Sequence, residues 1–156
     1  MLEIYVDGDA CPVKEEILRV AGRHGLVVYL VSNRWLRSPE NPLVRQIVVT
    51  DGFDAADNWI AEHAGTGDIV VTSDIPLASR CLKTGAEVLG PTGRPFTPAN
   101  IGMALAMREL KSQLRDMGDI RDHNASFSKQ DRSAFLQALE RVIQALRRQH
   151  PAGPAA

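Results

Sequence analysis

Two aspartates stand where short apolar runs of the chain end: Asp7 follows residues 2–6, and Asp74 follows residues 69–72 after one serine. Short β-branched runs that alternate with helical patterns are typical of parallel strands in an α/β domain. In such sheets the ligand site lies beyond the carboxyl ends of the strands, where the strand order reverses. We therefore expect both carboxylates to face one crevice. Because crowded carboxylates repel one another, they favour a bound proton or a cation, and oxygen ligands suit Mg²⁺ or Mn²⁺.

Further carboxylates belong to the same predicted site. Asp54 and Asp57 open a predicted helix, and their i, i+3 spacing places them on one helical face. Hydrolysis of a phosphodiester by two metal ions requires several convergent carboxylates. We predict Asp7, Asp57 and Asp74 as catalytic residues, and the same three together with Asp9 as metal ligands. Two alternatives stay open, because Asp54 also suits a helix cap and Asp9 could either cap the first helix or bind metal.

Five strands, separated by helices, are predicted to position these residues. The strands cover residues 2–6, 26–31, 44–50, 68–72 and 86–89. Helical patterns begin at Pro12, Asp54 and Pro76, and they alternate with the strands. This alternation predicts an α/β fold with three α/β/α layers around a mostly parallel five-stranded sheet.

The alternation changes in the last third of the chain. Residues 90–96 are predicted to form a loop, and two longer helices follow, beginning near Thr97 and Ser128. We expect both helices to pack at the end of the domain. The apolar stripe of the second helix, from Phe135 to Leu146, could cover the sheet or form a homodimer interface.

The composition limits the classes of protein to consider. The 156 residues suit one domain, predicted over residues 1–150, with a disordered tail over residues 151–156. Residues 118–127 form a predicted polar loop, within which residues 119–124 could either close over a substrate or be disordered. Cys11 and Cys81 are the only cysteines, which suits a reducing cytoplasm and excludes a zinc site built from cysteines alone.

Neither a membrane nor a secretion signal is expected. No apolar run approaches the roughly 20 residues that span a bilayer, and the N-terminus enters a strand without a basic n-region, so we expect a cytoplasmic protein. The net charge is −1. Binding to nucleic acid would therefore depend on a local basic patch rather than on the charge of the whole molecule.

Five short motifs along the chain carry a resemblance to a known family. They are Val6-Asp7-Gly8-Asp9-Ala10-Cys11-Pro12, Asp54-Ala55-Ala56-Asp57, Val71-Thr72-Ser73-Asp74-Ile75-Pro76-Leu77-Ala78, Gly93-Arg94-Pro95-Phe96-Thr97 and Asp131-Arg132-Ser133-Ala134-Phe135-Leu136-Gln137-Ala138-Leu139. In this order they resemble the YaiI/YqxD family of bacterial proteins, from the first strand to about residue 146. That family is in turn similar to PIN-like nuclease domains.

The resemblance implies a fold and an activity. It implies that the predicted strands lie in the order 44–50, 26–31, 2–6, 68–72 and 86–89, so that Asp7 and Asp74 end adjacent strands. It also implies metal-dependent cleavage of RNA, with Asp7, Asp57 and Asp74 in the three acidic positions of PIN-like domains. Those domains usually carry one more acidic residue on an earlier helix, for which Glu15 and Glu16 are both candidates.

Four residues are predicted to contact the substrate: Ser73, Arg94, Arg132 and Arg34. Arg94 and Arg132 fall within the motifs that resemble the family, and Ser73 could orient a water molecule. Arg34 flanks Trp35, whose ring could stack on an unpaired base. Arg108, Lys111 and Arg115 recur at helical spacing and could form a basic stripe, although such runs are commonly solvated faces.

Three functions are compatible with these residues. The first is a Mg²⁺- or Mn²⁺-dependent phosphodiester hydrolase of the ribonuclease type. The second is a non-catalytic module that binds RNA or a nucleotide and keeps a structural ion. The third is a phosphatase of the haloacid-dehalogenase type, in which Asp7 attacks phosphorus and Asp9 acts as acid and base. This third function needs a later lysine, for which Lys83 is the nearby candidate, and a second acidic pair, whereas Asp74 stands alone.

Overall fold

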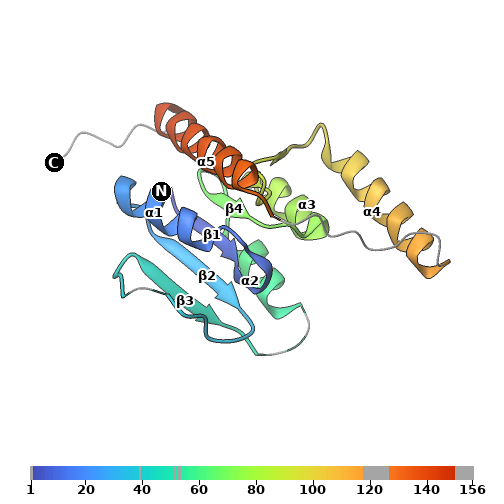
Figure 1. Cartoon of the computed structure of the whole chain (residues 1–156), viewed down its shortest axis with the longest axis horizontal. Helices are drawn as coiled ribbons and strands as arrows, with labels where there is room; N and C mark the ends of the chain where they lie inside the picture. The colour runs from blue at the N-terminus through green and yellow to red at the C-terminus, as the bar shows by residue number, and fades with distance from the viewer. Residues whose placement is uncertain (1, 39, 51, 53, 118–126, 150–156) are drawn as a thin grey trace.

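The chain forms a sheet of six strands in the residues that the structure, a computed structural model, describes: 2–38, 40–50, 52, 54–117 and 127–149. The strands are β1 (Ile4–Asp7), β2 (Val28–Ser32), β3 (Val44–Val48), β4 (Ile69–Val71), β5 (Glu87–Leu89) and β6 (Pro95–Phe96). Their order is β3-β2-β1-β4-β5-β6, and β1 to β5 are parallel (Figure 1). The predicted order of the first five strands is confirmed.

The sixth strand corrects the prediction of a loop over residues 90–96. Pro95 and Phe96 pair antiparallel with Leu89 and Val88 of β5. A tight turn brings the chain back, because the N–H of Gly90 donates to the carbonyl of Arg94 at 2.9 Å. Gly93 in this turn has φ +88°, a conformation that side chains with a Cβ rarely adopt.

Five α-helices lie in the described part of the chain. They are α1 (Lys14–His24), α2 (Ala55–His63), α3 (Ile75–Lys83), α4 (Ile101–Asp116) and α5 (Lys129–Gln149). The first begins two residues after Pro12, the predicted start, because the chain leaves β1 through a short 3-10 turn over Gly8–Ala10. The predictions for the tail and for most of the loop over residues 118–127 lie outside the described residues.

Two pairs of helices cover the two faces of the sheet. Ile4 and Val6 of β1 pack with α1 and α5 on one face, whereas Tyr5 packs with α2 and α3 on the other (Figure 1). The predicted α/β/α layers are therefore confirmed. Because a central strand meets apolar side chains on both faces, it can be apolar throughout, as residues 69–71 are.

Helix α5 settles which of its two predicted roles its apolar stripe takes. Phe135, Leu139 and Ile143 are fully buried in the cluster that contains Ile4, and Leu146 is nearly so. Burying each of these side chains stabilises the fold by about 1.5–3 kcal/mol. The stripe thus covers the sheet and is not available as a dimer interface.

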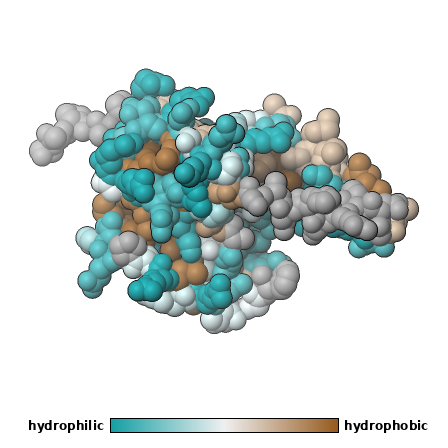
Figure 2. Space-filling view, in the orientation of Figure 1, coloured by the Kyte–Doolittle hydropathy of each residue, from teal (hydrophilic) through white to brown (hydrophobic). Residues whose placement is uncertain are grey.

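Helix α4 packs against α3 and does not cover a face of the sheet. None of its residues is buried, and α3 is the helix with which it makes most of its contacts. Figure 1 shows it projecting beyond the sheet, and Figure 2 shows apolar side chains on the surface in this region. In the described part of the chain, no helix combines the length and the apolar character that a membrane crossing requires.

Candidate functional site

Asp7 and Asp74 are connected through a single buried threonine. β1 and β4 are adjacent parallel strands, so their carboxyl ends lie side by side. The hydroxyl of Thr72, just beyond β4, donates a hydrogen bond of 3.0 Å to Oδ2 of Asp7. The hydroxyl oxygen of Thr72, Oγ1, accepts the backbone N–H of Asp74 at 3.0 Å. Thr72 therefore fixes the direction of the Asp7 carboxylate relative to the start of α3.

Asp74 is the N-cap of α3. Its Oδ1 accepts the backbone N–H of Leu77 at 2.9 Å, and Pro76 occupies the first turn, where its missing N–H is not needed. The capping role considered for Asp54 takes a different form, since Asp54 holds the N-cap position of α2 without a side-chain capping bond. Of the two aspartates, Asp74 caps its helix with its side chain.

Asp9 does not cap α1, whose N-cap is Val13, and its side chain instead contacts the loop after β2. It lies in the turn after β1 and is exposed, and both of its carboxylate oxygens accept the backbone N–H of Asn33, at 3.1 and 3.2 Å. Asn33 begins the loop after β2. Asp9 thus fastens this loop to the carboxyl end of β1.

The electrostatics show which carboxylates lie close together. Burial, together with the charges of Asp74, Asp7 and Asp54, raises the pKa of Asp57 to about 6, whereas Arg80 opposes the change. Burial is also the main reason why the pKa of Asp7 is raised, and Asp9 and Asp74 add to it, while the bond from Thr72 opposes the change. Carboxylates from β1, α2 and the start of α3 therefore repel one another at one edge of the sheet.

This acidic cluster, made of Asp7, Asp9, Asp54, Asp57 and Asp74, is not a closed metal cage. Among the described residues, no three His, Cys, Asp or Glu side chains lie close enough together to hold an ion. Mg²⁺, however, usually keeps several waters and binds one or two carboxylates together with substrate phosphates. The oxygen donors and the uncompensated negative charge of the cluster fit an ion of that class.

Gly8 explains why a glycine separates Asp7 and Asp9. A Cβ at this position would lie 2.7 Å from Cδ1 of Leu36 and 3.1 Å from the carbonyl oxygen of Val31. Leu36 is buried, and its backbone N–H donates to Oε1 of Gln46 at 2.9 Å, while Nε2 of Gln46 donates back to the carbonyl of Leu36. The loop after β2 is thus packed directly on the turn that carries Asp9.

The same loop presents Arg34 and Trp35 to solvent. Trp35 is 72% exposed, although its neighbour Leu36 is buried. Most of the Trp35 ring is therefore accessible at the surface. Because Asn33 is bonded to Asp9, this exposed ring and the exposed Arg34 belong to a loop that is attached to the acidic cluster.

Ser73 and Arg94 both line a groove in the protein surface. The groove has a volume of about 510 Å³ and lies between the turn after β4, the turn before β6 and helix α4. Arg108, Lys111 and Arg115 of α4 line it as well. Local sequence patterns predicted their basic stripe but not the groove, because the groove depends on how α4 docks against α3.

Arg132 lies in a different environment from the one predicted. Its Nη1 donates to Oε1 of Glu16 at 2.8 Å and to the carbonyl of Pro12 at 2.9 Å, and its guanidinium lies 4.9 Å from the ring centre of Phe127. These contacts tie α5 to α1. Arg132 thus compensates the buried Glu16, whose second oxygen, Oε2, has no hydrogen-bond partner among the described residues.

Both cysteines are free thiols that are shielded from solvent, Cys81 fully and Cys11 in part. Burial, with smaller contributions from Asp7 and Glu16 and against the opposing Lys14, raises the pKa of Cys11 to about 11, so its sulfur is a thiol at neutral pH. Burial likewise raises the pKa of Cys81 to about 11. Neither residue has the electropositive surroundings that a reactive thiolate needs.

The fold and the site define an α/β protein with an acidic cluster at the carboxyl ends of two central parallel strands. Comparison with known proteins gives its family. Residues 5–145 match the model of the family described as "Uncharacterized BCR, YaiI/YqxD family". The chain belongs to the YaiI/YqxD family.

Relatives match the chain over nearly its whole length. It is 60% identical over 139 residues to a UPF0178 protein of Rhizobium etli, covering 89% of this chain and 90% of the relative. It is 58% identical over 151 residues to a UPF0178 protein of Parvibaculum lavamentivorans, covering 97% of this chain and 99% of the relative. No solved structure matches the chain.

Proposed function

We propose that the protein is a Mg²⁺- or Mn²⁺-dependent phosphodiester hydrolase that acts on RNA. Its ion would bind one or two carboxylates of the set Asp7, Asp57, Asp74 and Asp9, and water molecules would complete its ligands. The observation that carries the proposal is the raised pKa of both Asp7 and Asp57, caused by burial and by the approach of carboxylates from separate elements. A fold keeps such repulsion only at a cost in stability, and a bound cation would offset it.

Each residue of the site has a defined task in this proposal. A bound divalent ion would lower the pKa of a water molecule and stabilise the charge that develops on the leaving oxygen. Thr72 holds the carboxylate of Asp7 in one direction. Ser73 is exposed beside Asp74 and can donate its hydroxyl to a phosphate, and Arg94, which lines the same groove, can neutralise that phosphate.

RNA is proposed as the substrate on two grounds. The first is the resemblance to PIN-like nuclease domains, in which Asp7, Asp57 and Asp74 correspond to the three acidic positions of those domains. The second is the exposed Trp35 on the loop attached to Asp9, because an exposed aromatic ring can stack on an unpaired base.

The test is a Mn²⁺ titration by calorimetry, followed by an RNA cleavage assay in the same buffer. Asp74→Asn is the most informative variant, because an asparagine keeps the oxygen that caps α3 while it removes the charge. Glu62→Gln is the control, because Glu62 is exposed and lies in the last turn of α2, at the opposite end of that helix from Asp57. Binding and ion-dependent cleavage that are both lost in Asp74→Asn and kept in Glu62→Gln would support the hydrolase, whereas no Mn²⁺ binding by the wild type would rule it out.

The non-catalytic binding module is the second candidate. It is favoured by the absence of three preassembled ligands among the described residues, since a hydrolase needs its ions fixed and a structural site tolerates looser coordination. In the same assay, Mn²⁺ binding and RNA binding without cleavage would favour this module over the hydrolase.

The phosphatase of the haloacid-dehalogenase type is disfavoured by the placement of its parts. Lys83 ends α3 at the opposite end from Asp74, about 13 Å away along the helix axis. In addition, both oxygens of Asp9, the required acid and base, accept the backbone N–H of Asn33.

A further inference from the structure

The groove beside α4 is strongly cationic. Its charged lining residues are Arg94, Arg108, Lys111 and Arg115, and no described Asp or Glu lines it. Arg108 and Lys111 are three positions apart on α4, so their side chains share one helical face, and both are exposed. The protein as a whole has a net charge of −1, so this concentration of positive charge is local. A polyanion is the ligand class that such a groove attracts.

Apolar surface accompanies the positive charge. Met103 and Met107 of α4 are 70% and 45% exposed, and both line the groove together with the half-buried Phe96. Methionine is flexible and polarisable, which suits contacts with flat rings of varied shape. Bases of an unpaired strand have free faces for such contacts, whereas a duplex hides those faces in its own stack.

One end of the groove lies next to the acidic cluster in the chain. Ser73, which lines the groove, directly precedes Asp74, and Asp74 is linked to Asp7 through Thr72. A strand that lies in the groove would therefore pass the carboxylates at one end. Repulsion by the acidic cluster and attraction by the groove together define where a phosphate backbone can be held.

We propose that the groove between α4 and the β5–β6 turn binds a single strand of RNA next to the phosphodiester that is cleaved. This inference rests on the proposed function for the choice of RNA. Arg108 and Lys111 contact phosphates, and Met103 and Met107 contact unpaired bases. The site thereby selects unpaired RNA over duplex RNA before any bond is broken.

The test measures binding alone, by fluorescence anisotropy of a short labelled oligouridylate in EDTA. The double variant Arg108→Ala/Lys111→Ala removes two charges from a helix that has no buried residue, and alanine favours helix, so it is expected to fold. We expect its affinity to fall roughly tenfold at about 50 mM salt, and the slope of log affinity against log salt to fall by about 1.4 in magnitude, since each lost phosphate contact on a single strand contributes about 0.7.

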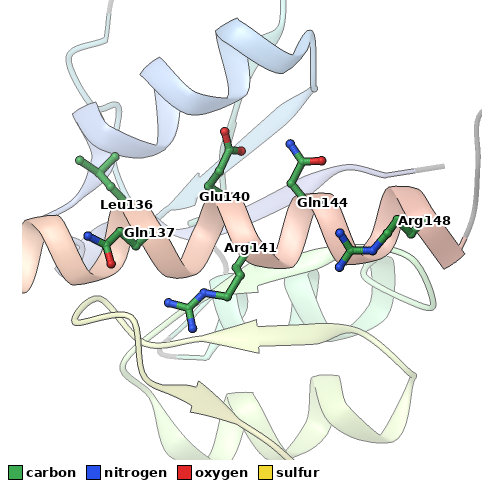
Figure 3. Close-up of a pocket in the computed structure, with 6 residues that line it drawn as sticks. All are labelled: Leu136, Gln137, Glu140, Arg141, Gln144 and Arg148. Carbon is green, nitrogen blue, oxygen red and sulfur yellow. The ribbon is translucent and has the colours of Figure 1, made fainter.

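A matched control removes the same charge elsewhere. Arg141 and Arg148 line a shallow depression whose six lining side chains all come from α5, as Figure 3 shows. Arg141→Ala/Arg148→Ala should leave affinity within about twofold of the wild type. An equal loss in both double variants would show that net charge alone drives binding, and it would overturn the proposal.

The occupant is tested by competition. Duplex RNA of the same length, or an acidic peptide, should displace the labelled strand far less well than unlabelled oligouridylate does. Equal displacement by the duplex would overturn selection of unpaired RNA, and equal displacement by the peptide would identify a different partner.

The two proposals fail in different ways. If the wild type binds the strand through the groove but never cleaves it with Mn²⁺, the proposed hydrolase is wrong and the groove stands. If Arg108→Ala/Lys111→Ala cleaves as fast as the wild type at substrate concentrations below saturation, the groove is wrong and the hydrolase stands.

Discussion

The hydroxyl of Thr72 donates a hydrogen bond of 3.0 Å to Oδ2 of Asp7, across the ends of two adjacent parallel strands. The hydroxyl oxygen of Thr72 also accepts the N–H of Asp74, so this one buried side chain sets the relative positions of the two aspartates. The link is a property of the strand order, since Thr72 can reach Asp7 only when β1 and β4 are neighbours.

Thr72→Val should destabilise the protein and weaken its binding of Mn²⁺. Valine has nearly the same shape but leaves Asp7 and the N–H of Asp74 without their partner, so we expect the free energy of unfolding to fall by about 1–2 kcal/mol. Urea unfolding in EDTA measures this, and calorimetry should show affinity for Mn²⁺ reduced about tenfold, as expected for loss of a group that orients a ligand. Thr72→Ser, which retains the hydroxyl, is the control. An unchanged Val variant would mean that the link has no energetic role.

Asp57→Asn should stabilise the metal-free protein at alkaline pH. The pKa of Asp57 is raised from 3.8 to about 6, so the folded state binds its proton more tightly than the unfolded state does. The cost of ionising it in the fold is absent below about pH 4, grows up to about pH 6, and is complete above that. This rise in pKa corresponds to roughly 3 kcal/mol, which solvent screening of a partly exposed carboxylate reduces to about 1 kcal/mol.

The measurement is urea unfolding of Asp57→Asn and the wild type in EDTA across this pH range. We expect the variant to be about 1 kcal/mol more stable near pH 8, with the difference vanishing near pH 4. Glu62→Gln on the same helix should show no such trend. A variant that is less stable than the wild type at every pH would show that Asp57 is not under repulsion.

Trp35→Ala should affect RNA binding without affecting stability. The ring is 72% exposed, and exposed positions of this kind usually change the free energy of unfolding by less than about 0.5 kcal/mol. If the ring stacks on a base, its loss should weaken binding by about 1–3 kcal/mol. Anisotropy with the oligouridylate measures this, and Trp35→Phe should restore most of the affinity. Unchanged binding by Trp35→Ala would remove Trp35 from the RNA surface.

Arg132→Met should lower stability without affecting RNA binding. The side chain of Glu16 is only 10% exposed, and loss of Arg132 leaves it unpaired, so we expect the free energy of unfolding to fall by about 2 kcal/mol. RNA affinity should stay the same. Glu16→Gln/Arg132→Met should recover much of the stability, because the buried charge is then gone. Arg141→Met on the exposed face of α5 is the control. Weaker RNA binding by a folded Arg132→Met would restore Arg132 as a phosphate contact.

The order of the first five strands could be predicted because each apolar run is followed by a helical pattern, and parallel strands joined by helices leave few arrangements. β6 could not, since two residues that include Pro95 carry no strand pattern. The sequence pattern of helix α4 was also misleading. Ile101 and Leu105 have the spacing of a core stripe, but α4 has no buried residue.

The candidate site could be predicted only in part. The strand ends indicated Asp7 and Asp74, and the capping role of Asp74 also has a local signal, an aspartate followed two positions later by Pro76. Arg132 has no such signal, because its partner Glu16 is 116 residues away in the chain. Pairings of that kind depend on which helices cover the sheet, which local patterns do not specify.

None of the side chains of helix α4 is buried, although Ile101 packs against one of the two core clusters. Substitutions along its surface therefore carry little penalty for folding, in contrast to substitutions in α5, where four residues are buried. A lineage of such proteins could alter which ligands it accepts by exchanging residues of α4 alone. Folding and ligand choice would then evolve almost independently, on separate helices of one small protein.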